Sequence, residues 1–377
     1  MSKWEWKKLK DICEKGSSNI KQSDLKDLTG DYPIFGASGY IQNVDFYQRN
    51  RDYIGIIKDG SGVGRTMLLP AFSSVIGTLQ YILPKEGNDI KFINYALQNI
   101  DFSKSVQGAA IPHIYFKDYG ETEILVPPLS EQKRIVKFLD EEFSKIETLK
   151  TNAETNLKKA GAIFDTELKK EFNNKKWDSK KLNDLCELIS GYAFDSKGYS
   201  SKNEDTLLVC GDNIMHCSFR WETVKRWPKE KCYELKRFEL KDSDIVLAMD
   251  RPWIKSGLKI SKITGNELPS LLVQRTAALR TTSHVSSDYL YYALQEKKFS
   301  DYLIDQQTGS GVPHISGKQI LNFQIPLPPL SVQKEIVARL DKISENVKRL
   351  EANYKQIITN CDELKKSILK KTFEGES

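Results

Sequence analysis

Two stretches of the chain place apolar residues at the spacing of a long α-helix. In the stretch 329–377 they step by four and three without a break: Ile336, Leu340, Ile343, Val347, Leu350, Tyr354, Ile357, Cys361, Leu364 and Ile368. The stretch 129–173 is looser and uses Ile135, Leu139, Phe143, Ile146, Leu149, Ala153, Leu157, Ala160, Ile163 and Leu168. Such seams predict helices of about 43 residues, roughly 65 Å long. Because each helix alone would expose its seam to water, we expect the two to pack together.

The pattern between and before these helices is different. Runs at 52–57, 74–83 and 244–249 are rich in β-branched residues and bounded by Gly, Asp or Pro, which predicts strands. The segments 92–97 and 289–294 have the pattern of short helices. The sequence therefore predicts two mixed α/β domains, at 1–128 and 174–328, each followed by a long helix at 129–173 and 329–377.

The junctions between domain and helix are repeated. PPLSEQKRIVKFLD at 127–140 returns as PPLSVQKEIVARLD at 328–341, with ten of 14 positions identical. The Trp-containing starts at 3–14 and 176–187 also align, as do the Pro-His-Ile segments 111–114 and 312–315. Pro128 and Pro329 should stop the preceding element, and Ser130 and Ser331 are good candidates for helix N-caps. The chain is a tandem duplication whose ends are alike and whose middles are not.

Composition narrows the class of protein only a little. The 377 residues are 39% hydrophobic, 29% charged and 10% aromatic, with a formal net charge of +6, which is enough for two globular domains and permits nucleic-acid binding without requiring it. The first ten residues contain no apolar run, and no window approaches the roughly 20 apolar residues of a membrane span. Six cysteines without a CxxC pair indicate reduced thiols, so we expect a cytoplasmic protein.

A duplicated enzyme would keep its active site similar in both copies, whereas a duplicated reader of two targets would keep its frame and vary its surface. The pattern resembles the specificity (S) subunit of type I restriction–modification systems. The resemblance rests on the Pro-Pro-Leu-x-x-Gln-x-x-Ile-Val helix starts at 127–136 and 328–337 and on the duplicated Trp-containing starts. The segments 36–40, 58–62 and 191–194 and the pair Gln274-Arg275 are similar too. The resemblance covers the chain essentially from end to end.

The resemblance implies a concrete architecture and function. Two α/β target recognition domains would be separated by two long helices packed as an antiparallel coiled coil, with a pseudo-twofold internal repeat. Each domain would read one half of a bipartite double-stranded DNA target, and the helices would dock two methyltransferase subunits, which restriction subunits then join. The chain itself would have no catalytic centre, metal or cofactor. The half-sites should differ in sequence, lie in opposite orientation and be about one turn, roughly 10 bp, apart.

Polar side chains on predicted loops are the candidates for DNA contact, because Lys and Arg bind phosphates while Arg and Gln also pair with guanine and adenine edges. In the first half they are Ser38, Tyr40, Lys58, Ser61, Arg65, Thr78, Gln80 and Gln107. In the second half they are Tyr192, Lys197, Arg251, Lys255, Gln274, Arg275, Gln307 and Ser310. His113 and His314, in the repeated Pro-His-Ile segments, are expected to be structural or to touch a phosphate.

Two other classes of protein have to be weighed. A stand-alone DNA-processing enzyme would need a motif that is missing: the two Pro-Pro pairs lack the Asn or Asp of an amino-methyltransferase, and 60–66 lacks the spacing of a phosphate loop. Glu-x-Lys triplets at 167–169, 234–236 and 239–241 are expected by chance in so charged a chain. Cys210, His216, Cys217 and Cys232 do not have the spacing of a common zinc finger. A non-specific coiled-coil scaffold would leave the large, divergent middles unexplained.

Overall fold

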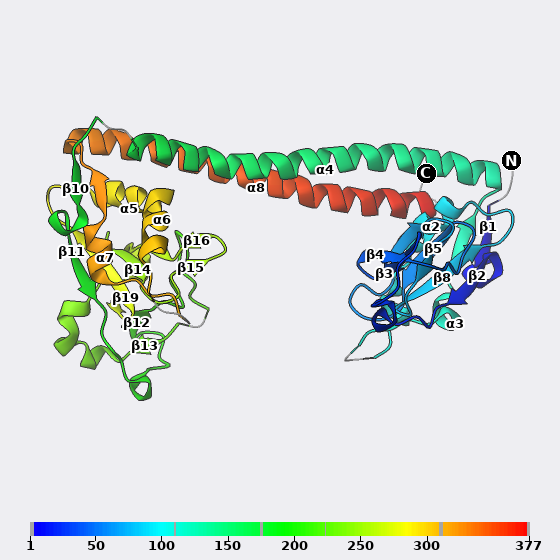
Figure 1. Ribbon diagram of the computed structural model, residues 1–377, viewed down its shortest axis with the longest axis horizontal. Coiled ribbons are helices and arrows are strands. Elements are labelled where there is room, and N and C mark those ends of the chain that lie inside the picture. The colour runs from blue at the N-terminus through cyan, green and yellow to red at the C-terminus, as the bar shows by residue number, and fades with distance from the viewer. Residues whose placement is uncertain (1–3, 109–110, 174–175, 223, 309–311, 375–377) are drawn as a thin grey trace. The chain divides into compact units, whose positions relative to one another are not determined.

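The computed structural model describes residues 4–108, 111–173, 176–222, 224–308 and 312–374 (Figure 1). The chain divides into two compact units. Unit 1 comprises Met1–Glu154 with Lys355–Ser377, and unit 2 comprises Thr155–Tyr354. The long helices α4 (Leu129–Phe172) and α8 (Leu330–Glu374) contribute to both. Each unit therefore contains a globular α/β part and a stretch of both helices.

Unit 1 is built on a four-stranded antiparallel sheet. Its strands lie in the order β2 (Cys13–Ser17), β8 (Leu79–Pro84), β5 (Tyr53–Ile57) and β6 (Thr66–Leu69). A second sheet has the order β4 (Gly39–Val44), β3 (Tyr32–Gly36) and β7 (Ser74–Val75), with β3 and β7 parallel, and β1 (Glu5–Lys8) pairs with β9 (Glu123–Val126). The short helices are α1 (Leu9–Ile12), η1 (Gln22–Leu25), α2 (Ile90–Gln98), η2 (Phe102–Ser105) and α3 (Phe116–Tyr119).

The central strand β5 shows how the unit is packed. All five of its residues are buried. Ile54 and Ile56 belong to a core shared with α2, whereas Tyr53 and Ile57 belong to a second core. Successive side chains of a strand point to opposite faces, so both faces of this sheet are covered. This explains the continuous apolar run that predicts the strand.

Unit 2 has a corresponding set of strands. Its four-stranded sheet has the order β11 (Cys186–Ser190), β19 (Thr276–Thr281), β14 (Ile245–Ala248) and β17 (Ile260–Lys262). The second sheet is β13 (Arg226–Trp227), β12 (Thr206–Val209) and β18 (Ser270–Leu272), and β10 (Ser179–Lys181) pairs with β20 (Gln324–Pro326). A hairpin joins β15 (Trp253–Ile254) and β16 (Gly257–Leu258). The helices are η3 (Leu182–Asp184), η4 (Ser196–Gly198), η5 (Lys229–Lys231), η6 (Tyr233–Phe238), η7 (Gly265–Glu267), α5 (Ser287–Gln295), α6 (Lys297–Gln306) and α7 (Gly317–Asn322).

The two middles, which diverge in sequence, share one topology. The order β2-β8-β5-β6 in unit 1 matches β11-β19-β14-β17 in unit 2, and β4-β3-β7 matches β13-β12-β18, including the parallel pair. Among the described elements, unit 2 adds the β15–β16 hairpin. The duplication therefore extends through the middles at the level of the backbone. The prediction of two α/β domains is confirmed.

The long helices begin one residue earlier than the serines that are expected to cap them. The carbonyl of Pro128 accepts hydrogen bonds from the amides of Glu131 and Gln132, and Pro329 does the same in unit 2. The residue whose carbonyl accepts the first helical bond is the N-cap, so the caps are the prolines and Ser130 and Ser331 lie inside the first turn. The N-cap prediction is wrong.

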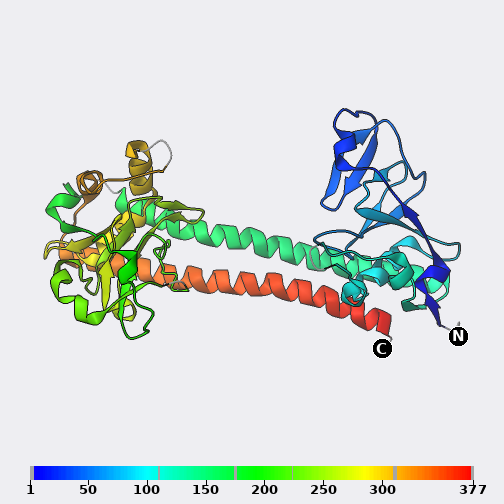
Figure 2. The same cartoon turned by 90° about the horizontal axis from the view of Figure 1, so that it is seen from below.

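The two long helices pack antiparallel within each unit (Figures 1 and 2). In unit 1 Lys150 Nζ lies 2.7 Å from Asp362 Oδ1, and Lys365 Nζ lies 2.6 Å from Glu147 Oε2. In unit 2 Arg339 pairs with Glu171 at 2.6 Å. The partner's residue number falls as the number on α4 rises, as antiparallel packing requires. No described helix is long and apolar enough to span a membrane.

The predicted seam is only partly correct. Leu139, Ala153, Ala160 and Leu340 are buried as expected. Four other seam residues are exposed: Leu149 (51%), Ile163 (47%), Leu350 (37%) and Leu364 (48%). An α-helix has 3.6 residues per turn, so a repeat of 3.5 drifts around its surface unless the helices supercoil. The regular heptad seam therefore describes only part of the contact between the two helices.

The repeated junction motif attaches each helix to its globular part. Gln132 is 1% exposed; its Nε2 donates to the Pro127 carbonyl at 2.9 Å and its Oε1 accepts from the Asp89 amide at 2.7 Å. Gln333 is fully buried and makes the same bonds, to the Pro328 carbonyl at 2.9 Å and from the Ser286 amide at 2.8 Å. Asp89 and Ser286 are the N-caps of α2 and α5.

The last residue of the motif makes a second attachment. The Tyr95 hydroxyl of α2 donates to Asp140 at 2.6 Å, and the Tyr292 hydroxyl of α5 donates to Asp341 at 2.5 Å. Gln and Asp of the motif thus bind the N-cap and the C-terminal half of the same short helix in both units. The motif is repeated because each unit needs the same rigid joint between sheet and helix.

Candidate nucleic-acid interface

In unit 1, loops from three parts of the chain meet at one edge of the main sheet. The amide of Lys58 donates to the Thr78 carbonyl at 3.0 Å, and the amide of Ile57 donates to the Arg65 carbonyl at 2.9 Å. The Ile76 amide donates to the Phe35 carbonyl at 2.9 Å, which brings in the β3–β4 turn. The predicted residues Ser38, Lys58, Arg65 and Thr78 therefore come together on these loops.

The side chains at this edge of unit 1 are largely polar. Arg65 crosses from the β5–β6 loop and donates from Nη2 to the Ala37 carbonyl at 3.2 Å. Lys58 Nζ lies 3.4 Å from Asp59 Oδ2. The hydroxyl of Thr78 is buried and has no hydrogen-bond partner among the described residues. Buried polar atoms normally find a partner, so the Thr78 hydroxyl is an unsatisfied group at this edge.

The Pro-His-Ile segment closes the same edge through its backbone. The Gly60 amide donates to the Pro112 carbonyl and the Ile114 amide donates to the Lys58 carbonyl, both at 2.9 Å. His113 and Gln107 exchange two backbone hydrogen bonds of 2.9 Å. The segment is a brace for the β5–β6 loop, which agrees with a structural role for the repeated histidine.

Unit 2 repeats this frame bond for bond. The Met249 amide donates to the Arg275 carbonyl at 2.9 Å, and the Ala248 amide donates to the Lys259 carbonyl at 3.1 Å. The Arg251 amide donates to the Pro313 carbonyl at 2.9 Å. By these bonds Met249 occupies the position of Lys58, Arg275 that of Thr78, and Lys259 that of Arg65.

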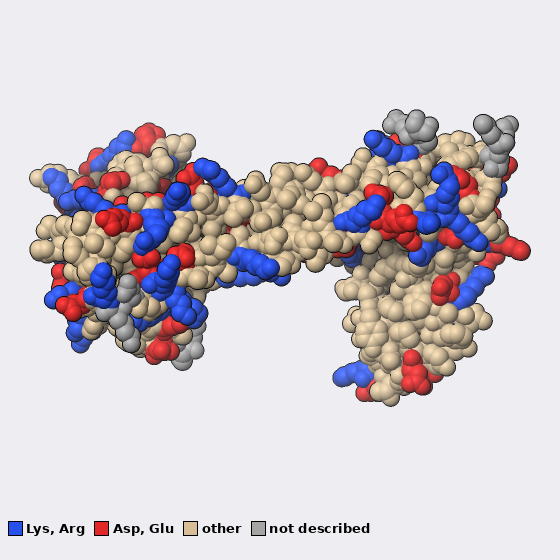
Figure 3. Space-filling view, turned by 90° about the horizontal axis from the view of Figure 1, so that it is seen from above, with Lys and Arg blue, Asp and Glu red and all other residues tan. Residues whose placement is uncertain are grey.

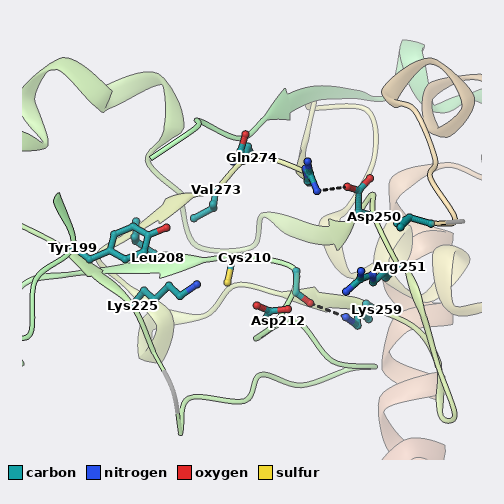
Figure 4. A pocket seen from close by; sticks show the side chains of 13 residues that line it. Tyr199, Leu208, Cys210, Asp212, Lys225, Asp250, Arg251, Lys259, Val273 and Gln274 are labelled. Atoms are coloured by element: carbon teal, nitrogen blue, oxygen red, sulfur yellow. Dashed lines mark hydrogen bonds and ion pairs between the residues drawn. The ribbon is translucent and has the colours of Figure 1, made fainter. Parts of the chain in front are cut away.

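A cavity of about 430 Å³ lies at this edge in unit 2 (Figure 4). Four cationic and two acidic side chains are among its lining: Lys225, Arg251, Lys259, Arg275, Asp212 and Asp250. Lys259 Nζ donates to the Gly211 carbonyl at 2.8 Å, as Arg65 does to Ala37 in unit 1. A cation at the same frame position thus caps the end of the same strand in both units.

Asp250 joins two side chains at the rim of this cavity. Its Oδ2 lies 3.2 Å from Arg275 Nη1, and its Oδ1 lies 2.5 Å from His314 Nδ1. In unit 1 the corresponding aspartate, Asp59, pairs with Lys58 instead. The frame is therefore the same and the charged contacts on it are different.

The remaining predicted residues of unit 1 are placed less uniformly. Tyr40 is 60% exposed on β4 beside the β3–β4 turn, and its hydroxyl donates to Asn43. Ser61 is exposed in the β5–β6 loop, and Gln107 donates to Asp118 at 3.1 Å. Gln80 is only 6% exposed, and its Oε1 accepts from the Tyr119 hydroxyl at 2.6 Å. Gln80 points into the core from a central strand and is not part of the surface.

In unit 2, Arg251, Gln274 and Arg275 line the cavity. Tyr192 is 41% exposed and packs against Phe194 and Phe238, beside the cavity rather than in it. The exposed residues Lys197 and Lys255 lie in η4 and in the β15–β16 turn. The side-chain Oε1 of Gln307 accepts from Trp253 Nε1 at 3.1 Å, which ties the loop after α6 to that hairpin. Ser310 lies outside the described residues.

Sequence reasoning misses Lys259, Lys225 and Asp250. Lys259 occupies the frame position of Arg65, and Lys225 lies over the ring of Tyr199, 5.5 Å from its centroid. Only the backbone pairing reveals that Lys259 corresponds to Arg65, because the two middles cannot be aligned by residue identity. On the face drawn in Figure 3, basic and acidic side chains are mixed over unit 2.

The cysteines do not form a metal centre in the described part of the chain. No group of three or more His, Cys, Asp or Glu side chains there could hold a metal ion, so Cys210, His216, Cys217 and Cys232 are not gathered as ligands. His216 Nδ1 contacts the Leu258 carbonyl at 3.0 Å. Burial raises the pKa of the repeated thiols Cys13 and Cys186 to about 12, so they are unreactive core residues.

Comparison with known proteins agrees with this architecture. The repeated α/β units with repeated polar edges define a duplicated binding protein. The family model described as type I restriction modification DNA specificity domain matches residues 1–158 and 174–360, and the chain belongs to that family. It is a specificity subunit, the non-catalytic component of a type I restriction–modification complex.

Individual relatives cover the chain to different extents. The MjaVIII specificity subunit of Methanocaldococcus jannaschii is 27% identical over 403 aligned positions, covering 99% of this chain and 92% of the relative. The EcoAI specificity subunit of Escherichia coli is 33% identical over 175 positions, covering 46% of this chain and 29% of the relative.

Two solved structures have the same fold. A chain from a structure on complex assembly and conformational transition of the type I R-M system has a TM-score of 0.76 at 18% identity, covering 98% of this chain and 97% of that one. The HsdS subunit from Thermoanaerobacter tengcongensis has a TM-score of 0.59 at 18% identity, covering 99% and 97%.

Proposed function

We propose that each unit reads one half of a bipartite double-stranded DNA target with the edge described above. The observation that carries this proposal is the repeated frame with exchanged side chains. Both units use the same backbone bonds to present the loops, yet the presented residues differ: Lys58 and Met249, Gly77 and Gln274, Thr78 and Arg275. A protein that recognises two different half-sites needs this combination.

The residues common to both edges and those that differ have separate proposed roles. All DNA shares its phosphates, so a cation at the same position in both units suits a phosphate contact. Arg65 and Lys259 meet that condition. The bases differ between half-sites, so the exposed side chains at positions that differ, above all Arg275 in unit 2, suit contacts with base edges. Of the residues expected from the sequence, Gln80 is left out of this interface because it is buried.

The modular division proposed for the chain is 1–128 and 174–328 for the two recognition domains and 129–173 and 329–377 for the helices. We propose that the helices dock two methyltransferase subunits and that restriction subunits join them. Support comes from apolar side chains on the helix surfaces, namely Phe138 (51% exposed), Leu149 (51%), Ile163 (47%) and Leu364 (48%). These side chains on α4 and α8 are uncovered in the chain by itself and would be accessible to a protein partner.

The test is a map of methylated bases in DNA from cells that express the full chain with its methyltransferase partner. A bipartite motif should appear. Replacing residues 15–125 with those of a relative of different specificity should change one half of the motif and leave the other half unchanged. A change in both halves, or in neither, would refute the modular assignment.

The same preparations separate the two other classes of protein. A scaffold without sequence preference would give no motif at all. A stand-alone enzyme would cut or methylate DNA without any added subunit, which the purified chain is expected not to do. Either result would remove the proposed function.

A further inference from the structure

We propose that Arg275 is the specificity-determining residue of unit 2, that it reads a guanine, and that Asp250 and His314 position its guanidinium. This inference rests on the proposed function, because it assigns one base contact to the edge that is proposed to read DNA. The argument uses the geometry of the three side chains, the backbone that carries them and the contrast with unit 1.

The guanidinium of Arg275 is held from one side and open on the other. Its Nη1 lies 3.2 Å from Asp250 Oδ2, and its side chain remains 71% exposed. A guanidinium carries five N–H donors in a rigid fork, so one contact with a carboxylate leaves donors for a ligand. Guanine presents two acceptors, O6 and N7, that such a fork binds in the major groove.

The carboxylate that holds Arg275 is itself held. Asp250 is 21% exposed in its side chain, and its second oxygen lies 2.5 Å from His314 Nδ1. His314 exchanges backbone hydrogen bonds of 3.0 and 2.9 Å with Thr308, and the next residue, Ile315, donates to the Met249 carbonyl. The series of side-chain contacts from His314 through Asp250 to Arg275 therefore starts from backbone that is hydrogen-bonded on both sides. Such support keeps the guanidinium in one orientation.

The backbone at this place is strained. Arg275 has φ +65° and Arg251 has φ +46°, a region that L side chains rarely adopt. They are two of the five non-glycine residues with positive φ in the described chain, and both line the same cavity. Strain of this kind persists where the surrounding structure enforces it, and it clusters at functional sites.

The ion pair favours a base over a phosphate as the partner of Arg275. Asp250 offsets the charge of the guanidinium, which weakens its attraction for a phosphate but leaves its directed donors in place. Arg251 and Lys259, on the same cavity, make no ion pair with a described residue and remain for the DNA backbone. Arg275 is therefore oriented toward a single base, while Arg251 and Lys259 in the same cavity supply positive charge for phosphates.

A purely structural role for the pair is disfavoured by unit 1. The same frame position there is Thr78, and Asp59 pairs with the neighbouring Lys58. The frame closes with the same bonds in the absence of an arginine, so the fold does not need Arg275. An ion pair as exposed as this one also adds little to stability.

The first test is Arg275→Gln and Arg275→Lys in the full chain, expressed with its methyltransferase partner, followed by mapping of methylated bases. We expect the preference for one G·C pair in one half-site to fall about 5- to 150-fold, with every other position of the motif unchanged. Arg237→Gln is the control, because Arg237 is exposed in η6 and lies outside the cavity. The control should leave the motif as it is.

The second test concerns the positioning residues. Asp250→Asn and His314→Gln should relax the same base pair and no other, and adding either to Arg275→Gln should cause no further relaxation. A structural role would lower methylation of all sites alike without changing the motif, and that result would overturn the assignment of Asp250 and His314.

The outcomes separate this inference from the function on which it rests. A bipartite motif that Arg275→Gln leaves intact, or weakens equally at all positions, would overturn the inference and leave the proposed function standing. A wild-type chain that gives no bipartite motif would remove both together.

Discussion

Units 1 and 2 have the same backbone frame and different side chains on it. The β5–β6 loop of unit 1 and the β14–β17 connection of unit 2 are fixed by matching amide–carbonyl bonds, and the Pro-His-Ile brace closes both. The ion pair between Arg275 and Asp250 at the cavity of unit 2 is not repeated among the described residues of unit 1, where the corresponding Asp59 pairs with Lys58.

The comparison of the two units shows which positions can change their side chain without loss of the frame. Backbone hydrogen bonds do not depend on the side chain that the residue carries, so the frame survives the exchange of Thr78 for Arg275 or of Lys58 for Met249. The joints are the opposite case. Gln132 and Gln333 act through their side chains on a fixed backbone partner, so the same residue is needed twice. Four changes test this contrast, from the largest expected effect to the smallest.

Leu139→Ala and Leu340→Ala should each destabilise their own unit by about 2–5 kcal/mol. Both leucines are fully buried, Leu139 in the core that contains α2 and Leu340 in the core that contains α5. Hydrogen exchange measured segment by segment should show lost protection in α2 for the first change and in α5 for the second. The control is Leu350→Ala, at a residue that is 37% exposed, with a smaller loss. Equal losses in both units from either change would contradict two separate cores.

Gln132→Ala and Gln333→Ala should cost about 1–3 kcal/mol each, because each removes a buried side chain that accepts from the part-buried amide of a helix cap. The amides concerned are those of Asp89 and Ser286. Local unfolding free energies of α2 and α5 from hydrogen exchange measure this. Lys133→Ala, next to Gln132 but exposed, is the matched control. Similar costs in both units are expected; a cost in only one would show that the joints are not equivalent.

Arg65→Gln and Lys259→Gln should weaken binding of the assembled complex to specific and non-specific DNA alike. If each contacts one phosphate, the slope of log affinity against log salt should become shallower by about 0.9 in each variant. Binding titrations at several salt concentrations measure the slope. A changed recognition motif with an unchanged slope would reverse the roles proposed for the common and the differing residues.

Asp140→Asn should change the acid dependence of unit 1. Burial pushes the pKa of Asp140 upward, but hydrogen bonds from Lys91 and Tyr95 outweigh it and hold that pKa below its ordinary value. A folded pKa below the unfolded one means that the carboxylate contributes stability above the unfolded pKa, which is lost as pH falls through the folded pKa. Below about pH 4 the wild-type unit should lose stability more steeply than the variant in urea unfolding. Parallel pH profiles would show that this joint does not depend on charge.

Much of the architecture follows from the sequence itself. Apolar spacing predicts the two long helices, the β-branched runs predict buried strands such as β5, and the repeated motif places the duplication. These features are local, since period and composition act over neighbouring residues. The duplication is visible in the sequence because both junctions require the same Gln and Asp side chains. The divergent middles alone would not reveal it.

Which residues share the proposed interface is decided only by the tertiary structure. Gln80 has the polar side chain expected of a DNA contact, yet the central position of β8 turns it into the core toward Tyr119. Lys259 has no sequence signal, yet backbone pairing places it where Arg65 stands in unit 1. A site assembled from loops that are far apart in sequence is specified by the sheet that joins them. The local pattern of each loop therefore predicts which residues are polar, and the fold determines which of them meet.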